Sequence, residues 1–261
     1  MRVAIIGTGK IGTDLLHKLR ILDVEIVGFV GRRNVPRPEP EYCPDGIDFF
    51  KGPKCCDVVF DCTDAESARV NNIVFASKGI RVIDLTPSRQ GFMCVPNVNC
   101  DRVGDHQNIS MITCGGQVSI PLVSLLAGVT DYVEVITQIS SESAGGATRA
   151  NIDEYIHTTE HAIKELTGLR SKVILNINPS PGAPMKTTVM LKADVPDLSQ
   201  LAISEYVPNY RLGPITRIDD VVSIPSYIEN SELPGNLDII NRAAIKILKK
   251  LMDYKTYGCD S

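Results

Sequence analysis

The sequence reads VAIIGTGKIG over residues 3–12, and this stretch joins a run of mostly β-branched residues to three closely spaced glycines. Apolar residues then recur at positions 11, 15, 16, 19 and 22, which is the spacing of a helix. A G-x-G-x-x-G turn between a strand and a helix lets the backbone approach a pyrophosphate, which the free amides of the helix N-terminus stabilise. The stretch therefore predicts a strand, turn and helix that bind a dinucleotide; a glycine turn with no ligand is the alternative.

The rest of the first half continues this alternation of strands and helices. We expect strands at Glu25–Val30, Asp57–Asp61, Arg81–Leu85 and Ile109–Thr113, and a helix at Glu66–Lys78. The proline-rich stretch Asn34–Asp45 is typical of a surface loop. Strands that alternate with helices predict right-handed crossovers and a doubly wound parallel sheet, so the fold class of this half is α/β.

After about residue 130 the pattern changes to runs rich in Val, Ile and Thr. We expect strands at Tyr132–Ile139, Lys172–Ile177, Thr187–Lys192 and Thr216–Ile224, with a turn at Asn178–Pro184 and one long helix at Asn151–Leu166. This pattern predicts an α+β domain with a mainly antiparallel sheet. We therefore divide the chain into a dinucleotide-binding domain, residues 1–114, and a catalytic and dimerisation domain, residues 115–236, with a last helix over residues 237–255 that packs back on the first domain.

Composition excludes several classes of protein. The chain has 261 residues with 27 basic and 31 acidic side chains, a net charge of −4 that provides no positive field for nucleic acid. Its apolar runs are too short to span a bilayer, so we expect no membrane segment and a cytoplasmic protein.

The cysteines and histidines do not form a metal or disulfide pattern. Eight cysteines lie at positions 43, 55, 56, 62, 94, 100, 114 and 259, without a C-x2-C pair, and the four histidines have no ligand-like spacing to them. A chain of this length without a secretory signal is also a poor candidate for a disulfide framework. We therefore expect no metal, and most of these thiols should be small buried side chains.

Cys114 differs from the other cysteines because it lies where a strand ends and a glycine-led segment begins. Amides at a helix start lower the pKa of a thiol, and Gly115 and Gly116 would clear space for a substrate carbonyl. Amides near these two glycines would also hold an oxyanion. From spacing alone, a reactive thiol and a buried structural cysteine are equally good interpretations.

Two arginines follow the second strand, where NAD-binding proteins usually place a carboxylate for the ribose 2′-hydroxyl. Arg32 and Arg33 stand there instead, and two guanidinium groups favour the 2′-phosphate of NADP. The alternative is that both arginines are solvated loop residues.

Several sequence blocks resemble the acylating, coenzyme A-dependent acetaldehyde dehydrogenases, the partners of 4-hydroxy-2-oxovalerate aldolases. The resemblance covers nearly the whole chain and is carried by Ile6–Asp14, Ile83–Pro87, Thr113–Gln117, Ser143–Gly145, Thr148–Glu154, Tyr206–Pro208 and Gly235–Ile239. It implies a Rossmann domain followed by an α+β catalytic domain.

The resemblance also implies roles for individual residues. Cys114 is then the acyl-thioester nucleophile. The family's contacts with the nicotinamide coenzyme match Thr8–Ile11, the segment Ser143–Asn151 and Asn236. With the motif glycines included, the predicted coenzyme-binding residues are Gly7, Thr8, Gly9, Lys10, Ile11, Gly12, Ser143, Ala144, Gly145, Gly146, Ala147, Thr148, Arg149, Ala150, Asn151 and Asn236.

The chain departs from the family pattern at several places. It is shorter, with the missing stretch between Arg211 and Leu233, and Gly146-Ala147 replaces the Pro-Gly of the cofactor loop. Thr187 stands where the family has an Asp suspected of assisting the coenzyme A half-reaction, and Arg33 stands at the acidic ribose-binding position. These changes leave the residues for hydride transfer intact and leave the acyl acceptor open. We assign no general base, because no histidine lies near Cys114 in the sequence.

The function that these residues favour is interconversion of a short-chain aldehyde and an acyl-CoA through a thioester on Cys114, with NADP, or alternatively NAD, as the hydride carrier. One rival is a reductase of a carrier-protein thioester or another activated acyl group. The other rival is a non-catalytic, cofactor-binding partner subunit of an aldolase. A homo-oligomer is expected in each case.

Overall fold

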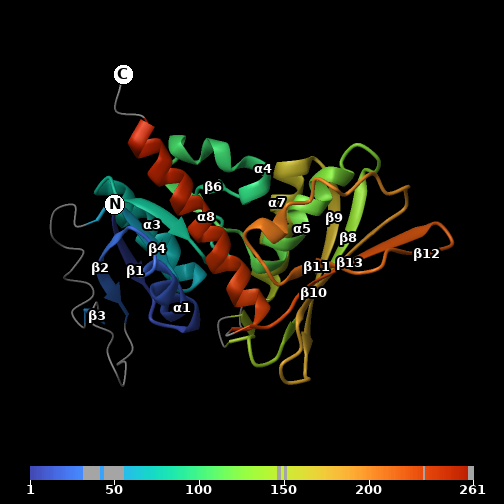
Figure 1. The fold of residues 1–261 in the computed structure, drawn as a ribbon, viewed down its shortest axis with the longest axis horizontal. Helices are drawn as coiled ribbons and strands as arrows, with labels where there is room; N and C mark the ends of the chain where they lie inside the picture. The colour runs from blue at the N-terminus through green and yellow to red at the C-terminus, as the bar shows by residue number, and fades with distance from the viewer. Residues whose placement is uncertain (32–41, 44–55, 146–147, 150–151, 232, 258–261) are drawn as a thin grey trace. The chain divides into compact units, whose positions relative to one another are not determined.

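A computed structural model describes residues 1–31, 42–43, 56–145, 148–149, 152–231 and 233–257. The chain forms two compact units (Figure 1). The first comprises Met1–Cys94, Cys100–Met111 and Ala244–Ser261, and the second comprises Val95–Asn99 and Ile112–Ala243. Among the described residues, no helix is both long enough and apolar enough to cross a membrane.

The first unit is built on a parallel sheet of seven strands in the order β3-β2-β1-β4-β5-β7-β6. The strands are β1 Arg2–Ile6, β2 Glu25–Val30, β3 Tyr42–Cys43, β4 Val58–Asp61, β5 Arg81–Asp84, β6 Phe92–Met93 and β7 Asn108–Ser110. This order confirms the predicted doubly wound parallel sheet. The strand expected to reach Thr113 ends at Ser110, because Ile112 has a φ of 64° and Thr113 already caps the next helix.

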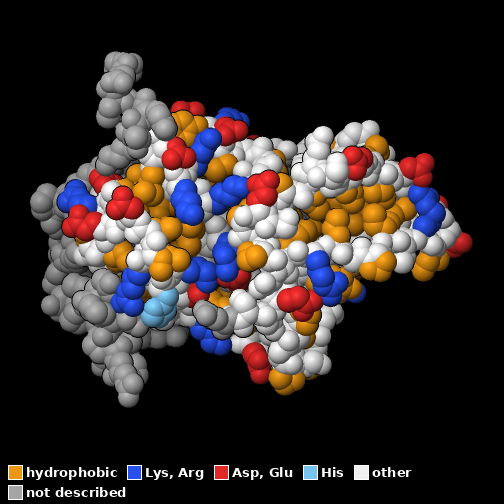
Figure 2. Space-filling view, viewed as in Figure 1, with side chains coloured by type: hydrophobic (Ala, Val, Ile, Leu, Met, Phe, Trp, Pro, Cys, Tyr) orange, Lys and Arg blue, Asp and Glu red, His pale blue; other side chains and the backbone are white. Residues whose placement is uncertain are grey.

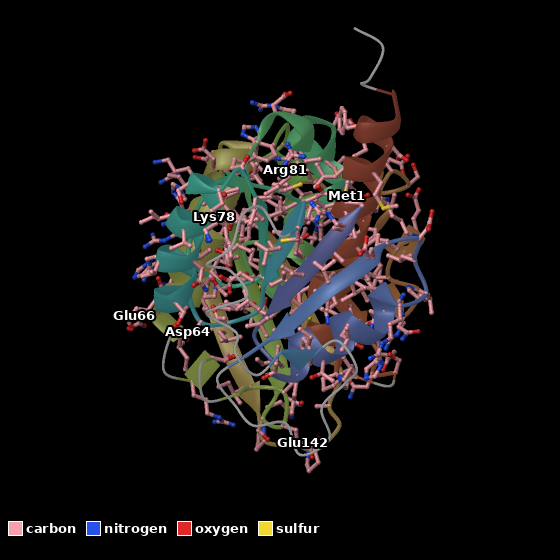
Figure 3. The ribbon with its side chains drawn as sticks, turned by 90° about the vertical axis from the view of Figure 1, so that its left-hand side faces the viewer. Met1, Asp64, Glu66, Lys78, Arg81 and Glu142 are labelled. Atoms are coloured by element: carbon pink, nitrogen blue, oxygen red, sulfur yellow. The ribbon has the colours of Figure 1, made fainter. Side chains whose placement is uncertain are left out.

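Helices α1 Lys10–Leu19 and α3 Ala65–Ser77 and the short helix η1 Cys100–Asp105 belong to this unit. Helix α1 begins directly after the glycine turn and buries Leu15, Leu16 and Leu19. At the start of α3 the Asp64 carboxylate accepts a hydrogen bond from the Ser67 amide, at 2.9 Å. Figure 3 shows Asp64 and Glu66 at one end of this helix and Lys78 at the other, which is the arrangement that the helix dipole favours.

The second unit contains a sheet in the order β11-β13-β10-β8-β9, with β12 paired to β13. The strands are β8 Tyr132–Ser140, β9 Arg170–Asn178, β10 Met185–Leu191, β11 Tyr210–Leu212, β12 Thr216–Ile218 and β13 Val221–Ile228. The sheet is mainly antiparallel, as predicted, but β8 and β9 run parallel because a helix connects them as a crossover. The single strand expected at Thr216–Ile224 is wrong: the chain turns at Asp219, which has a φ of 52°, and forms two strands.

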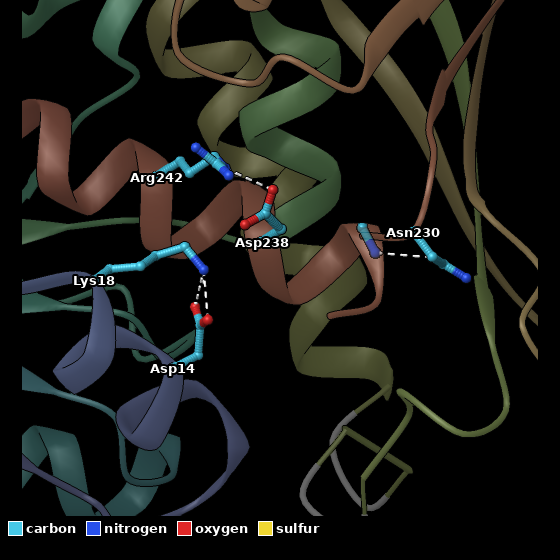
Figure 4. Close-up of polar contacts among 6 residues, drawn as sticks. Asp14, Lys18, Asn230, Asp238 and Arg242 are labelled. Atoms are coloured by element: carbon cyan, nitrogen blue, oxygen red, sulfur yellow. Dashed lines mark hydrogen bonds and ion pairs between the residues drawn. The ribbon is translucent and has the colours of Figure 1, made fainter. Parts of the chain in front are cut away.

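The helices of the second unit are α4 Pro96–Asn99, α5 Cys114–Leu126, α7 Ile152–Thr167 and the short η2 Ile203–Glu205, and helix α8 Gly235–Tyr257 begins in it and continues into the first unit. The Asn230 side-chain oxygen accepts a hydrogen bond from the Gly235 amide, at 3.1 Å, and so anchors the start of α8 (Figure 4). One turn into α8, Arg242 and Asp238 pair at 2.6 Å. A similar pair on α1, Lys18 with Asp14, also follows the i,i+4 spacing.

Two carboxyl groups lie side by side at the ends of β4 and β5. Asp61 and Asp84 are register partners, and both are fully buried. Burial, followed by the nearby Asp61, raises the pKa of Asp84 to about 7, although hydrogen bonds from Ser88 and Thr86 oppose the shift. Burial also raises the pKa of Asp61. The carboxyl edge of the parallel sheet therefore contains an acid that changes its charge near neutral pH.

This raised pKa makes the stability of the fold depend on pH. Folded Asp84 holds its proton where the unfolded chain has lost it, so its stabilising contribution is complete below about pH 4 and is lost as the pH rises through about 7. In Asp84→Asn the side chain stays neutral. Between about pH 5 and pH 8 the unfolding free energy of this variant should improve relative to wild type by on the order of 2 kcal/mol. Urea unfolding at both pH values measures this difference, and equal pH slopes would contradict the burial argument.

Candidate active site

The three glycines of the turn in the first unit have different surroundings. Gly7 has a φ of 104°, and a Cβ atom there would lie 2.4 Å from the Cys62 carbonyl oxygen. A Cβ atom on Gly12 would lie 1.9 Å from the Gly7 carbonyl oxygen. Gly9, in contrast, has nothing within 4 Å of its Cβ position, and it caps α1 without a side-chain hydrogen bond. Protein packing requires the first and third glycines, whereas the middle glycine leaves the backbone open to a ligand.

The residues beside the glycine turn are also compatible with a ligand at this position. Thr8 and Ile11 are half-buried and Lys10 is exposed. A Cβ atom on Gly31 would lie 2.4 Å from the Thr8 hydroxyl oxygen, so the end of β2 packs closely against the turn. An open backbone at a helix N-terminus suits the pyrophosphate of a dinucleotide. Arg32 and Arg33 lie outside the described residues, so the preference for NADP stays a prediction.

Cys114 is the first residue of helix α5, and Thr113 caps this helix. The Thr113 hydroxyl oxygen accepts a hydrogen bond from the Gly116 amide at 2.9 Å and lies 2.8 Å from the Thr159 hydroxyl oxygen, which in turn lies 2.8 Å from the Tyr155 carbonyl. A carbonyl can only accept, so the single hydroxyl hydrogen of Thr159 is donated to the Tyr155 carbonyl. Thr159 therefore accepts from the Thr113 hydroxyl, and Thr113 accepts from the Gly116 amide. This series fastens the start of α5 to α7.

Among the described residues, the side chain that the sulfur of Cys114 contacts by a hydrogen bond is Tyr155, whose hydroxyl oxygen lies 3.6 Å away. The Gly115 amide donates to that hydroxyl oxygen, at 2.9 Å. Burial raises the pKa of the Cys114 thiol, while hydrogen bonds from Tyr155 and from the amides of Gly115 and Cys114 lower it. The lowered pKa expected from the helix start is therefore wrong for this structure, because loss of hydration outweighs the hydrogen bonds.

The two glycines after Cys114 serve packing rather than substrate access. A Cβ atom on Gly115 would lie 2.2 Å from the Tyr155 hydroxyl oxygen and 2.7 Å from the Thr137 hydroxyl oxygen. A Cβ atom on Gly116 would lie 2.9 Å from a methyl group of Ile112. The amides suggested for an oxyanion are also engaged, by Tyr155 and by Thr113. Glycine is needed here because α5 begins in close contact with α7 and β8.

The second predicted coenzyme segment lies in the same unit as Cys114. Ser143 and Ala144 are buried, and the Arg149 guanidinium donates to the carbonyls of Ala144 and Ser141, both at 3.0 Å. Gly145 is exposed, and Thr148 is half-buried. Asn236 is buried in the first turn of α8. Gly146, Ala147, Ala150 and Asn151 lie outside the described residues.

One hydrophobic cluster joins these parts of the second unit. It contains Ala144 from the coenzyme segment and Ile239 from the first turns of α8, and Cys114 packs against it. The structure therefore brings together Cys114, the segment around Ala144 and the start of α8, three places at which the sequence predicts site residues. The glycine turn belongs to the other unit.

Sequence reasoning missed Tyr155 and Thr137. The sequence places Tyr155 only within the predicted helix Asn151–Leu166 and Thr137 only within the predicted strand Tyr132–Ile139. The available signals were that a buried tyrosine hydroxyl needs a partner and that Thr137 occupies an inward position of its strand.

The other described cysteines have different surroundings. Cys56, Cys62, Cys94 and Cys100 form no disulfides. Burial raises the pKa of Cys62, whereas a hydrogen bond from Cys94 lowers that of Cys100. Cys100 is nevertheless buried, and it begins only the short helix η1, whereas Cys114 begins the much longer helix α5. Within the described part of the chain, no group of three or more His, Cys, Asp or Glu side chains is placed to hold a metal ion.

Solved structures with the same architecture identify the fold. Aspartate semialdehyde dehydrogenase II of Vibrio cholerae, complexed with ASA, matches with a TM-score of 0.67 at 15% identity, covering 97% of this chain and 98% of that one. Aspartate semialdehyde dehydrogenase of Candida albicans, with NADP, matches with a TM-score of 0.67 at 14% identity, covering 96% and 99%. The protein therefore has the two-domain fold of the semialdehyde dehydrogenases, a Rossmann domain with a second, mixed-sheet domain.

Sequence relatives identify the family. Residues 114–232 match the family described as prokaryotic acetaldehyde dehydrogenase, dimerisation. The chain is 44% identical to an acetaldehyde dehydrogenase of Spirochaeta aurantia, with 96% of this chain and 94% of the relative covered. It is 42% identical to an acetaldehyde dehydrogenase of Burkholderia pseudomallei (strain 668), with 94% and 93% covered. The chain belongs to the acetaldehyde dehydrogenase family, a family of oxidoreductases, and the resemblance found in its sequence is confirmed.

The close packing at Gly115 predicts the effect of a methyl group. Gly115→Ala should lower the unfolding free energy by about 1–3 kcal/mol, because the added carbon meets two buried oxygens. Gly128→Ala is the matched control, since a Cβ atom there meets nothing within 4 Å, and it should change stability by less than about 0.5 kcal/mol. Chemical denaturation of both variants measures the difference. Equal stabilities would show that α5 does not begin in this tight contact.

Proposed function

We propose that this protein interconverts a short-chain aldehyde and an acyl thioester, with coenzyme A as the acyl acceptor, through an acyl group carried on Cys114. The observation that carries the proposal is the placement of this thiol: it begins helix α5, it is half-buried, and its sulfur lies 3.6 Å from the Tyr155 hydroxyl. Cys114 is also the first residue of the segment that matches the acetaldehyde dehydrogenase family.

Covalent chemistry on Cys114 divides the oxidation into two steps. The thiolate adds to the carbonyl carbon of the aldehyde; a sulfur–carbon bond forms while one electron pair of the C=O bond moves onto oxygen, which gives a thiohemiacetal. Loss of hydride from that carbon, with return of the oxygen electron pair, leaves a thioester on Cys114. The coenzyme A thiolate then adds to the thioester carbon, and the bond to Cys114 breaks, which restores the Cys114 thiolate. In reverse, the same steps reduce an acyl thioester.

The residues present fit a nicotinamide coenzyme, which accepts or supplies the hydride when it is bound. The turn from Gly7 to Gly12 would hold its pyrophosphate, because Gly9 leaves the backbone open at the start of α1. Ser143–Arg149 and Asn236 are the further contacts that we propose. Arg32 and Arg33 support NADP over NAD, and the Candida albicans structure of the same fold is one with NADP. An NADP preference favours the reductive direction.

The acyl intermediate and the coenzyme are tested in one experiment. Incubation with acetyl-CoA should add an acetyl group to the Cys114 peptide, and NADPH should remove it faster than NADH does. Cys114→Ser should stay unmodified and lose activity by several orders of magnitude, because its hydroxyl is a far weaker nucleophile. Intact-mass and peptide mass spectrometry follow the acetyl group.

The matched control is Cys100→Ala, which removes a buried thiol of the other unit and should still be acetylated on Cys114. Acetylation of a different cysteine, or a fully active Cys114→Ser variant, would refute the mechanism. Acetylated carrier protein, offered in place of acetyl-CoA, separates the coenzyme A acceptor from its carrier-protein rival.

We also propose that the protein is a homo-oligomer that associates through the second unit. Figure 2 shows hydrophobic side chains gathered over the strands of this unit, and Tyr132, Ile174, Leu212, Ile215 and Ile218 are its exposed large hydrophobic residues on or beside those strands. An apolar surface of this kind marks an interface. The family model that matches residues 114–232 is that of a dimerisation domain, which supports association through this unit. The aldolase partner implied by the sequence resemblance stays a prediction.

A charge placed on this surface should separate the subunits. Ile174 lies on β9 and is 41% exposed, so Ile174→Lys should reduce the mass in solution from that of an oligomer to that of a monomer. Val70→Lys, on α3 of the first unit, is the matched control and should leave the oligomer intact. Light scattering after gel filtration measures the mass. A wild-type monomer, or an Ile174→Lys oligomer, would contradict the proposal.

A further inference from the structure

A row of hydroxyl side chains crosses the buried face of the sheet in the second unit. Thr137 on β8 pairs in register with Thr187 on β10, and Thr187 pairs with Ser226 on β13. All three are buried. We call these three residues the hydroxyl row. The next inward-facing registers are apolar on both sides: Val135, Val189 and Ile224 on one side, and Ile139, Met185 and Ile228 on the other.

This row is unfavourable for stability alone. The Ser226 hydroxyl donates to the Thr187 carbonyl at 3.2 Å, but the Thr187 side-chain oxygen has no hydrogen-bond partner among the described residues. Thr137 makes no short, well-aligned hydrogen bond either, and the polar group that it faces is the Tyr155 hydroxyl. A buried hydroxyl without a good partner costs about 1–3 kcal/mol, which an isosteric valine would avoid. Thr137 therefore needs an explanation from the site that it faces.

Thr137 lies beside Gly115, the residue that follows Cys114. Its hydroxyl oxygen and that of Tyr155 both lie within 2.7 Å of one point, the position that a Cβ atom would take on Gly115. The Tyr155 oxygen accepts the Gly115 amide at 2.9 Å and lies 3.6 Å from the Cys114 sulfur. The phenol of Tyr155 therefore meets three polar groups: the amide, the Thr137 hydroxyl and the thiol.

The protonation state of Cys114 decides the direction of these contacts. The Gly115 amide can only donate, so it occupies one lone pair of the Tyr155 oxygen. A thiolate can only accept, so the single hydrogen of the phenol turns to the sulfur, and the Thr137 hydroxyl then donates to the second lone pair. The Thr137 side chain lowers the pKa of Tyr155, against the burial that raises it, and this is the direction that a donor facing the phenol oxygen would give. Every donor and acceptor of the phenol is then used.

We propose that the Tyr155 hydroxyl, whose oxygen accepts a hydrogen bond from the Gly115 amide, donates its hydrogen to the Cys114 thiolate while the Thr137 hydroxyl turns to donate to the second lone pair of the phenol oxygen. Tyr155 is then a further catalytic residue of this site, and Thr137 is its positioning residue. The inference rests on the proposed function of Cys114 and extends it. Tyr155 supplies the hydrogen bond that opposes the burial of the thiol, and the hydroxyl row explains why a polar residue is kept at position 137.

Among the described residues, no charged side chain contributes to the pKa shift of Cys114. On α7 the histidines at 157 and 161 are exposed, and His157 faces Glu160 at 3.8 Å rather than the thiol. Glu134 and Lys186 lie on even positions of β8 and β10, and side chains alternate along a strand, so they project from the opposite face to the hydroxyl row. Helix α4 carries no charged residue. Tyr155 is the side chain that lowers the pKa of Cys114.

The test is the pH dependence of Cys114 alkylation by iodoacetamide, measured on the Cys114 peptide by mass spectrometry between about pH 6 and pH 11, without substrate or coenzyme. Tyr155→Phe should move the midpoint upward by about one pH unit, which is a tenfold lower alkylation rate near neutral pH. Thr137→Val should move it in the same direction by a smaller amount. Tyr210→Phe, which alters another buried tyrosine of the second unit, on β11, is the matched control and should leave the midpoint unchanged.

Folding is followed in parallel, because a merely structural role would appear there. Thr137→Val should unfold at the same or a higher urea concentration than wild type while its alkylation midpoint rises, and this combination is specific to a role in positioning Tyr155. If Tyr155→Phe folds poorly, Thr137→Val alone decides the outcome. Wild-type midpoints in both variants would overturn the inference but leave acylation of Cys114 intact. Absence of acetylation by acetyl-CoA would instead refute the proposed function, whatever the alkylation profile.

Discussion

The contact between the Gly115 amide and the Tyr155 hydroxyl is the constraint on which the rest of the site depends. It holds the first turn of α5 against α7 at a distance that only glycine permits. The hydrogen bonds from Gly116 through Thr113 and Thr159 to the Tyr155 backbone fix the same two helices a second time. As a result, the sulfur of Cys114 has a defined polar neighbour, and the thiol is held at a helix N-terminus in a largely dehydrated position.

This arrangement balances two opposing effects on the thiol. Burial disfavours the thiolate, whereas the Tyr155 hydroxyl and the amides of the first helical turn favour it. A dehydrated thiolate is a stronger nucleophile than a hydrated one, but burial makes it harder to form. The hydrogen-bond donors that favour the thiolate therefore matter more here than at an exposed cysteine. The same logic accounts for a hydroxyl row inside an apolar sheet face: the polar side chain at 137 serves the site rather than the core.

The sequence predicted the parts of the fold that depend on local patterns. The glycine turn, the parallel strands of the first unit and the long helix after residue 151 follow from periodicity and turn chemistry, and the structure has all of them. The sequence indicated only the start of helix α5, at Cys114; its extent was not predicted, because it is buried on nearly every side and contains Pro121, so no 3.6-residue alternation is visible. The turn at Asp219 and the parallel pairing of β8 with β9 depend on tertiary contacts that no local pattern records.

The candidate site shows a similar division. Cys114 and the coenzyme motif were visible as residue types at characteristic junctions, but the partners of the thiol were not. Tyr155 lies 41 positions from Cys114, and only the packing of α7 on α5 brings them together. The error in the expected pKa of Cys114 has the same origin, because the helix start is a local feature and burial is not.

The most direct test of the central claim is a crystal structure of the protein after reaction with an acyl-CoA in the absence of coenzyme. The account predicts electron density that continues from the Cys114 sulfur into the acyl carbon, with the Tyr155 hydroxyl still in contact with the Gly115 amide. An acyl group on any other residue, or a Cys114 sulfur turned into the core and away from Tyr155, would contradict it.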